Sequence, residues 1–257
     1  MTATFEPLKI LFYDLETAPL LAHIWHPTDD YVPMDRLIHG SFLLTWSAKW
    51  RGDRTVHTGV VTPAEATSQS DARIVEQLAD MIREADFIVA HNANRFDVPM
   101  LNNRLLALGL EPVGPKQSLD TLVWAKKNFR LAYNKLDYLG EFLGLGRKLK
   151  TDFDLWRSCY HGDAKALARM AKYNKQDVVL LELVFNALLP YVKNLPRLIE
   201  PNDARLHACP TCGSDQLSKR GCSRTNTSTF QRYQCNGCRR YCRDRTAERN
   251  RLAVTPL

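Results

Sequence analysis

The order of hydrophobic and polar residues predicts short strands alternating with amphipathic helices over residues 1–190. Apolar, β-prone runs predict strands at 8–14, 41–50 and 55–61, the last two joined by a turn at Gly52-Asp53. The remaining pattern predicts, in chain order, a helix from an Asp71 N-cap through Ile82, a strand at 86–92, a helix from Asp97 that Gly109 stops, a strand at 118–120, helices at 120–128 and 135–143, and a helix from Asp163 to about Leu189. This order indicates an α/β layered domain with a mixed sheet.

Prolines mark the end of this domain. Between Pro190 and Pro201 they punctuate a stretch without clear periodicity, and a cysteine-rich segment follows. We therefore expect a domain over 1–190, a linker over 191–204 and a small domain over 205–257.

The composition is that of a globular protein. Of 257 residues, 45% are hydrophobic, which allows a sizeable core. No run approaches the roughly 18 apolar residues of a membrane span, and the N-terminus lacks a signal-peptide pattern. We expect a cytoplasmic protein with no membrane partner.

The net charge of +7 is unevenly distributed along the chain. Residues 205–257 contain eleven Lys and Arg against three Asp and Glu, a formal charge of +8. The 24 basic and 25 acidic residues of 1–204 give −1. A basic excess confined to the tail indicates a polyanionic partner such as nucleic acid, although a solvated basic tail is the alternative.

Acidic residues occur where elements of the predicted sheet and helices end or pack. Asp14 and Glu16 stand two apart in the first strand and therefore share a face. Asp97 follows the buried strand that begins at residue 86. Tyr173 and Asp177 lie four apart on the packed face of the last long helix. Together these carboxylates predict an all-oxygen site for two Mg²⁺ or Mn²⁺ ions, the arrangement used for phosphodiester displacement.

The segments "DLET", "HN…FD" and "YNKQD" resemble, in order, the three motifs of the DEDD superfamily of 3′-to-5′ exonucleases. That superfamily has an RNase H-like fold and includes the proofreading domains of DNA polymerases. Tyr173 four residues before Asp177 is similar to the tyrosine subgroup (DEDDy). The similarity is closest to family B polymerase-like and free-standing bacterial or phage members, and it covers about residues 6–190.

The resemblance implies a three-layer RNase H-like exonuclease domain. It further implies that Asp14, Glu16, Asp97 and Asp177 bind the metal ions and that Tyr173 orients the attacking water. The localisation it suggests is the cytoplasm of a bacterium or of a phage-infected host.

Contacts to the terminal nucleotide are expected from the residues around these motifs. The resemblance implies backbone contacts from Thr17 and Ala18. Asn92 and Phe96 are weaker candidates for contact with the strand, and Phe96 is also typical of a core residue. His91, Asp120 and Asp163 are interpreted as structural, the two aspartates as N-caps.

Two Cys-x2-Cys pairs lie in the basic tail. Cys209 with Cys212 and Cys235 with Cys238 present four thiolates, the ligand set of a structural zinc ion, and resemble a zinc ribbon. Two disulfides or free thiols are the alternative, which a cytoplasmic setting disfavours.

Cys222 and Cys242 leave the ligand set open, because either has the chemistry to replace one of the four. Arg224, Arg232 and Tyr233 are candidates for nucleic-acid contact through phosphate pairing and base stacking. A ribbon that docks a replication or repair protein is the rival interpretation.

The function we expect is metal-dependent 3′-to-5′ exonuclease activity on single-stranded DNA, with release of 5′-mononucleotides by a two-metal-ion mechanism. An exoribonuclease with the same chemistry and a catalytically silent zinc-ribbon adaptor are the alternatives.

Overall fold

The computed structural model describes residues 8–26, 31–200 and 207–247. Two compact units divide the chain, Lys9–Phe185 and the residues from Asn186 onward, so the division falls near the end of the last long helix. Each unit is described by itself.

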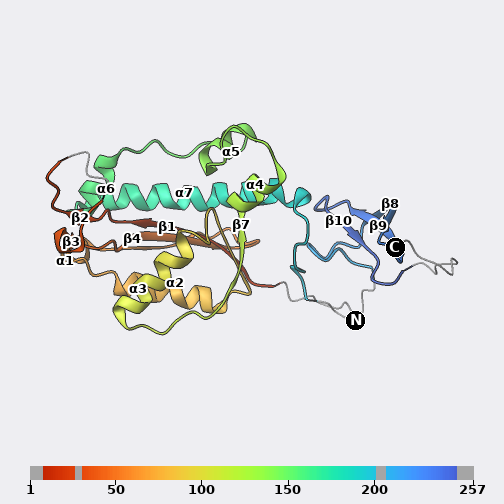
Figure 1. The fold of residues 1–257 in the computed structure, drawn as a ribbon, viewed down its shortest axis with the longest axis horizontal. Helices are drawn as coiled ribbons and strands as arrows, with labels where there is room; N and C mark the ends of the chain where they lie inside the picture. The colour runs from red at the N-terminus through yellow and green to blue at the C-terminus, as the bar shows by residue number, and fades with distance from the viewer. Residues whose placement is uncertain (1–7, 27–30, 201–206, 248–257) are drawn as a thin grey trace. The chain divides into compact units, whose positions relative to one another are not determined.

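The larger unit is built on a five-stranded mixed sheet with the order β5-β4-β1-β6-β7 (Figure 1). β1 pairs antiparallel with β4 and parallel with β6. The strands are β1 (Ile10–Thr17), β4 (Leu43–Trp50), β5 (His57–Val60), β6 (Phe87–Ala90) and β7 (Gln117–Asp120). The predicted strands are therefore present, and the predicted mixed α/β fold is confirmed.

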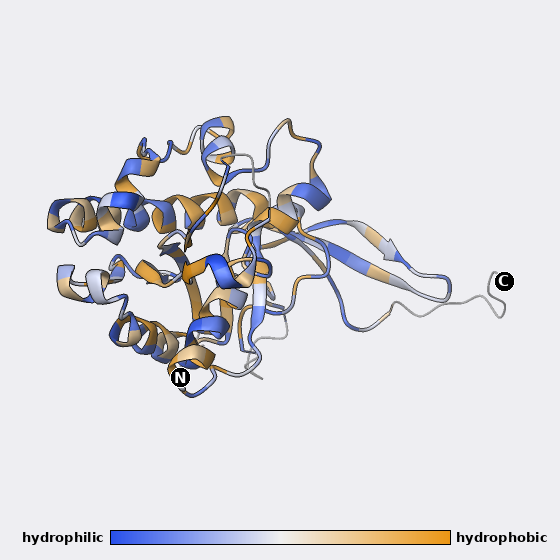
Figure 2. Ribbon diagram, turned by 60° about the vertical axis from the view of Figure 1, so that its left-hand side comes forward, coloured by the Kyte–Doolittle hydropathy of each residue, from blue (hydrophilic) through white to orange (hydrophobic). Residues whose placement is uncertain are grey.

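Helices cover both faces of this sheet, with α2 and α3 on one side and α7 on the other (Figure 1). The helices are α1 (Pro63–Ser68), α2 (Ala72–Glu84), α3 (Asp97–Leu108), α4 (Thr121–Asn128), α5 (Leu136–Phe142), α6 (Phe153–Tyr160) and α7 (Ala164–Leu188). Most of them carry hydrophobic and hydrophilic residues side by side along their length, as amphipathic helices do (Figure 2). Among the described residues, no helix has the length and apolar character needed to span a membrane.

The central strand β1 determines which side chains reach which helical layer. Leu11, Tyr13 and Leu15 are buried in the same core cluster as residues of α2 and α3. Phe12 points to the opposite face, where its ring meets Phe185 of α7 at a centroid distance of 5.1 Å. Because side chains alternate along a strand, Asp14 and Glu16 lie on the α7 side as well.

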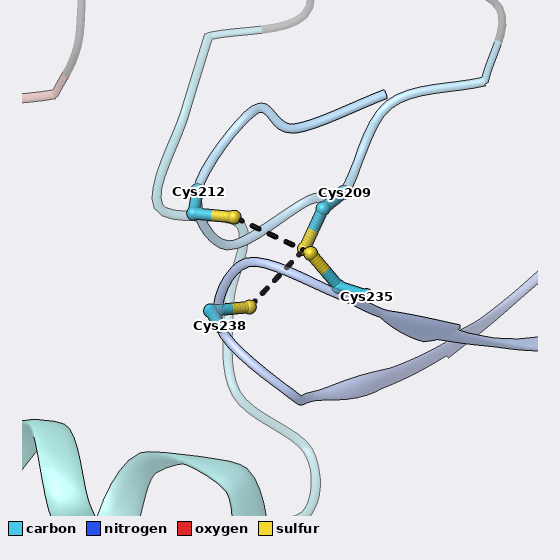
Figure 3. A group of neighbouring side chains, drawn as sticks. All are labelled: Cys209, Cys212, Cys235 and Cys238. Atoms are coloured by element: carbon cyan, nitrogen blue, oxygen red, sulfur yellow. Dashed lines mark hydrogen bonds between the residues drawn. The ribbon is translucent and has the colours of Figure 1, made fainter. Parts of the chain in front are cut away.

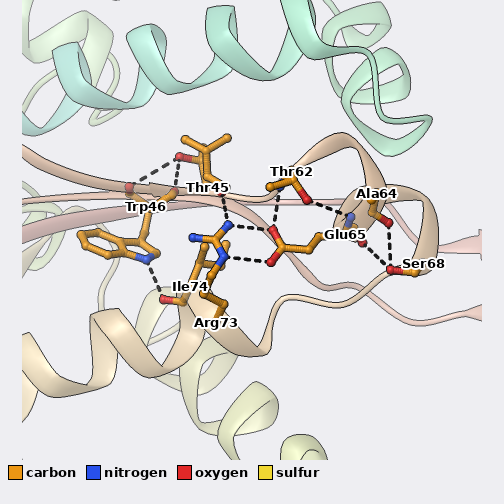
Figure 4. Close-up of polar contacts among 10 residues, drawn as sticks. Thr45, Trp46, Thr62, Ala64, Glu65, Ser68, Arg73 and Ile74 are labelled. Carbon is orange, nitrogen blue, oxygen red and sulfur yellow. Dashed lines mark hydrogen bonds and ion pairs between the residues drawn. The ribbon is translucent and has the colours of Figure 1, made fainter.

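On the face of the sheet that α2 covers, polar contacts connect β4 and β5 with α1 and α2 (Figure 4). Trp46 donates its Nε1–H to the carbonyl of Ile74 at 2.7 Å, and Arg73 pairs with Glu65. Gly59 lies opposite Trp46, and a Cβ at this position would come within 2.3 Å of the indole nitrogen. Glycine is therefore required for the indole to pack.

Asp71 precedes α2 as predicted, but the prediction that its side chain caps the helix is wrong. Its buried carboxylate accepts instead from the guanidinium of Arg104 and from the backbone N–H of Leu43. The ion pair with a neighbouring helix and the contact to the strand use both carboxylate oxygens.

Among the described residues, several short elements were not predicted, including two strands and two helices. β2 (Leu21–Ala22) and β3 (Leu37–His39) form a small hairpin between β1 and β4. α1 begins at a capping box of Thr62 and Glu65, and α6 is capped by Asp152. Each segment is too short to show a clear hydrophobic period.

The smaller unit is a three-stranded antiparallel sheet with the order β10-β9-β8. Its strands are β8 (Leu217–Arg224), β9 (Thr229–Cys235) and β10 (Tyr241–Arg243). Few of its side chains are buried, so its own apolar core is small.

Candidate active site and candidate zinc site

Three carboxylates from β1 and α7 meet beside the central strand. The ligand oxygens of Asp14, Glu16 and Asp177 all lie within 4.8 Å of one another. The two strand residues share the face that α7 covers, and Asp177 is fully buried on that helix. Segments about 160 residues apart in the sequence therefore build one acidic cluster.

Asp97 lies next to this cluster and not inside it. It is the first residue of α3, is 2% exposed, and its Oδ1 has no hydrogen-bond partner among the described residues. Burial, followed by the charge of Asp14, raises its pKa well above the usual range. The site thus holds a fourth acid, Asp97, close enough to Asp14 for the two negative charges to repel each other.

The electrostatics of the cluster fit a cation site. Burial raises the pKa of Asp14 to about 7, and burial together with the charge of Asp14 raises that of Glu16 to about 8. Asp177 Oδ1 is also buried and has no hydrogen-bond partner in the part of the chain that the structure describes. Buried carboxylates with unpartnered oxygens are costly unless a cation neutralises them, and oxygen-only donors suit Mg²⁺ or Mn²⁺.

Tyr173 lies one helical turn before Asp177, and its side chain is buried at the edge of the cluster. Its ring meets Trp156 of α6 edge-on, at a centroid distance of 6.1 Å. Burial raises the pKa of Tyr173 above its usual value, so the phenol keeps its proton at neutral pH.

Lys148 is a site residue that the sequence did not predict. Its Nζ donates to Asp177 Oδ2 at 2.5 Å and to the hydroxyl of Tyr173 at 3.2 Å. Burial favours the neutral amine, but the charges of Asp14 and Asp177 outweigh this and raise the pKa of Lys148. The ammonium therefore contacts both Tyr173 and Asp177 of α7. It comes from the loop between α5 and α6, where no periodicity singles it out.

Two further side chains fix the strand carboxylates. Asn174 Nδ2 donates to Asp14 Oδ2 at 2.7 Å from a fully buried position. Trp156 Nε1 donates to Glu16 Oε2 at 3.2 Å. Asn174 was not predicted as a site residue. Its position within "YNKQD", between Tyr173 and Asp177, is the sequence signal that indicates its place at the site.

The predicted nucleotide contacts occupy different environments. Ala18 is buried and its N–H donates to the carbonyl of Phe42 at 2.9 Å. The backbone contact predicted for Ala18 would therefore use its carbonyl oxygen. Thr17, the last residue of β1, and Asn92, in a left-handed conformation, are half-buried. Phe96 is 39% exposed and is therefore not a core residue.

The polar residues interpreted as structural have structural partners. His91 Nδ1 lies 2.9 Å from Thr121 Oγ1, and His91 Nε2 lies 2.8 Å from the carbonyl oxygen of Asn134. Asp120 accepts from N–H groups at the start of α4, and Asp163 accepts from the N–H of Ala166 in α7. All three interpretations are confirmed.

The four predicted zinc ligands come together in the smaller unit (Figure 3). Their sulfur atoms all lie within 4.8 Å of one another. Sγ of Cys209 is 3.5 Å from Cys238 and Sγ of Cys212 is 3.6 Å from Cys235. Zn–S bonds of about 2.3 Å in a tetrahedron place sulfurs about 3.8 Å apart, so the geometry fits a zinc ion.

Both Cys-x2-Cys segments adopt the same backbone turn. In one, Gly213 N–H donates to the carbonyl of Cys209, and Cys209 N–H donates to that of Ser214. In the other, the corresponding pairs are Arg239 with Cys235 and Cys235 with Arg240. This internal repeat of the turn is the local structure that presents four thiolates to one ion.

The remaining tail candidates are divided between the two faces of the ribbon. Cys222 and Cys242 lie on β8 and β10, outside the four-cysteine group. The strand register places Arg224 and Tyr233 on one face of the sheet and Arg232 on the other.

Together, the mixed sheet flanked by helices and the acidic cluster beside its central strand are typical of an RNase H-like domain. Residues 43–189, more than half of the chain, match the RNase H superfamily, and the protein belongs to this superfamily. The matched range starts after Asp14 and Glu16, so it includes two of the four acids.

Among solved structures, the chain is similar to the family B DNA polymerase from the hyperthermophilic archaeon Pyrobaculum calidifontis. The TM-score is 0.51 at 19% sequence identity, and the likeness covers 72% of this chain. It covers 25% of the polymerase, so this chain spans about a quarter of that protein's length and shares its fold there. No curated protein matches the sequence.

Proposed function

We propose that this protein is a metal-dependent 3′-to-5′ exonuclease of the DEDDy type that acts on single-stranded DNA. The observation that carries the proposal is the convergence of Asp14, Glu16 and Asp177 within 4.8 Å, with Tyr173 one turn away. Membership of the RNase H superfamily and the likeness to a DNA polymerase support it.

Asp14, Glu16, Asp97 and Asp177 hold two Mg²⁺ or Mn²⁺ ions in this proposal. When bound, the cations stabilise the attacking and leaving oxygens of the displacement. Fully ionised, the four acids and Lys148 have a formal charge of −3, which two divalent cations offset.

The remaining residues position the reacting groups. Tyr173, a protonated phenol held by Lys148, orients the attacking water. The water oxygen forms a bond to phosphorus as the bond to the 3′ oxygen of the preceding nucleotide breaks. A 5′-mononucleotide leaves, and the shortened strand keeps a 3′-hydroxyl. Thr17, Ala18, Asn92 and Phe96 contact the terminal nucleotide.

The domain limits follow the same proposal. Residues 1–190 form the exonuclease domain, 191–204 the linker, and 205–257 a zinc ribbon in which Cys209, Cys212, Cys235 and Cys238 hold structural Zn²⁺. The ribbon binds the nucleic acid and supplies the positive charge that the catalytic domain lacks.

The test is a time course on 5′-labelled single-stranded DNA and the matching RNA, with Mg²⁺, Mn²⁺ or no added cation. Wild type is compared with Asp14→Ala and with Asp86→Ala, an acid outside the cluster whose carboxylate accepts from the Lys9 backbone. We expect a ladder that shortens from the 3′ end and is lost in Asp14→Ala alone. Faster loss of RNA would identify an exoribonuclease, and binding without degradation of either polymer would favour the adaptor interpretation.

A further inference from the structure

One face of the ribbon sheet gathers arginine and aromatic side chains. Paired residues of antiparallel strands share a face, so Arg243 lies beside Arg232 and Tyr241 beside Gln234. Alternation along β9 adds Phe230 to the same face. Arg220 of β8 joins it, because its Nε donates to Gln234 Oε1 at 3.3 Å. We call Arg220, Phe230, Arg232, Tyr241 and Arg243 the arginine face.

Two of the three arginines of this face lie over its rings. The guanidinium carbon of Arg243 lies 3.9 Å from the centroid of Phe230, and that of Arg232 lies 5.5 Å from the centroid of Tyr241. Arg232 Nε also donates to the carbonyl of Arg220 at 2.9 Å. Tyr241 nevertheless remains 51% exposed. Side chains held in this way lose little freedom when they bind a ligand.

No carboxylate opposes this charge within the strands. β8, β9 and β10 contain no Asp or Glu. Asp244, which follows β10, accepts a hydrogen bond from the hydroxyl of Tyr233, which lies on the opposite face. A surface with three arginines and two rings, and with no acid in the strands that form it, is complementary to a polyanion whose subunits have flat faces.

We propose that the arginine face binds single-stranded nucleic acid, with phosphates at Arg220, Arg232 and Arg243 and a base stacked on Tyr241. This inference rests on the proposed function and extends it. It assigns the binding of single-stranded nucleic acid to one face of the ribbon, and it places Arg224 and Tyr233 outside the contact. Guanidinium planes stacked on rings offer both charge and a flat surface to a passing strand.

The test separates this face from the general charge of the tail. Full-length protein carrying Asp14→Ala, so that no strand is degraded, is titrated with oligo-dT over a range of salt concentrations. Arg232→Gln with Arg243→Gln is compared with Lys219→Gln with Arg224→Gln, which removes the same charge from exposed residues of the opposite face. Zinc content and melting temperature confirm that each variant is folded.

Loss of two phosphate contacts reduces the slope of log affinity against log salt by about 1.4. At 0.1 M salt this corresponds to a loss of affinity of roughly 25-fold. We expect this for the arginine-face pair and less than about twofold for the control pair. Equal losses in both pairs, or none in either, would overturn the proposal.

Stacking is tested separately with Tyr241→Leu. A stacked base contributes about 1–3 kcal/mol, so affinity for oligo-dT falls at least about fivefold. Affinity for an abasic oligonucleotide of the same length stays unchanged, because its phosphates remain. An equal loss on both strands would refute stacking at Tyr241. Hydrolysis by the wild type is measured independently, so failure of the exonuclease proposal and failure of this one are distinguishable.

Discussion

Replacing Asn174 with alanine tests whether the buried amide tunes the acidic cluster. Its Nδ2 donates to Asp14 Oδ2 at 2.7 Å, and this bond lowers the pKa of Asp14 against burial, in addition to the larger lowering by the charge of Lys148. A hydrogen bond to a charged group contributes about 1.5–3 kcal/mol, and about 1.4 kcal/mol corresponds to one pKa unit. Asn174→Ala should therefore raise the pKa of Asp14 by about one unit or more above its value of about 7.

The consequence is weaker cation binding at neutral pH, because a cation must then displace a proton more often. We expect the apparent affinity for Mn²⁺ to fall at least about fivefold at pH 7, because the ionised fraction of Asp14 falls by about that factor when its pKa rises by one unit. Zinc-loaded protein is titrated with Mn²⁺ by calorimetry, and the dependence of strand hydrolysis on Mn²⁺ is measured in parallel. Gln176→Ala is the matched control, because this amide lies two residues along α7 and donates to the carbonyl of Arg147 instead.

The two measurements also separate tuning from simple loss of packing. Raising the pH to 9 should restore much of the affinity of Asn174→Ala, since Asp14 then ionises without help. The reasoning is refuted if the folded variant binds Mn²⁺ as tightly as the wild type. It is also refuted if Gln176→Ala loses as much.

Three further predictions concern the other parts of the molecule. Tyr173→Phe should slow hydrolysis at least about tenfold and change Mn²⁺ affinity less than about twofold, and an unchanged rate would remove the phenol from the mechanism. Mn²⁺ affinity of the wild type should rise between pH 6 and pH 8, because the pKa values of Asp14 and Glu16 are raised to about 7 and about 8 and both must lose their protons; a flat profile in calorimetry would contradict this. Cys235→Ser should lower the zinc content, measured by atomic absorption, from one ion per chain towards zero, whereas Cys222→Ser should leave it at one.

The strands and the acidic motifs were predictable because their signals are local. Asp14 and Glu16 share a face wherever β1 is a strand, and Tyr173 shares a face with Asp177 wherever α7 is a helix. Neither pattern says that the two faces meet. That step was inferred from the cost of several acids at packed positions and from their suitability as ligands for divalent cations, and the resemblance of the three motifs, taken in order, to a known superfamily supported it.

Contacts between side chains that lie far apart in the sequence were not predictable in this way. Asp71 has the sequence pattern of an N-cap, yet its carboxylate pairs with Arg104. A charged partner on a neighbouring helix offers a stronger hydrogen bond than the backbone N–H groups of the first turn. The sequence pattern therefore predicted the position of Asp71 before α2 correctly and the hydrogen-bond partner of its carboxylate wrongly.

Lys148 shows why an acidic cluster cannot be completed from its acids alone. Four buried or half-buried carboxylates repel one another, so the metal-free fold needs a positive charge near them, and that charge can come from any segment that reaches the site. Here it comes from a loop whose lysines and arginine look solvated in the sequence. Its ammonium contacts Asp177 and Tyr173 together. The physical requirement for a counter-charge is therefore predictable from the motifs, whereas the residue that meets it is determined by the path of the chain.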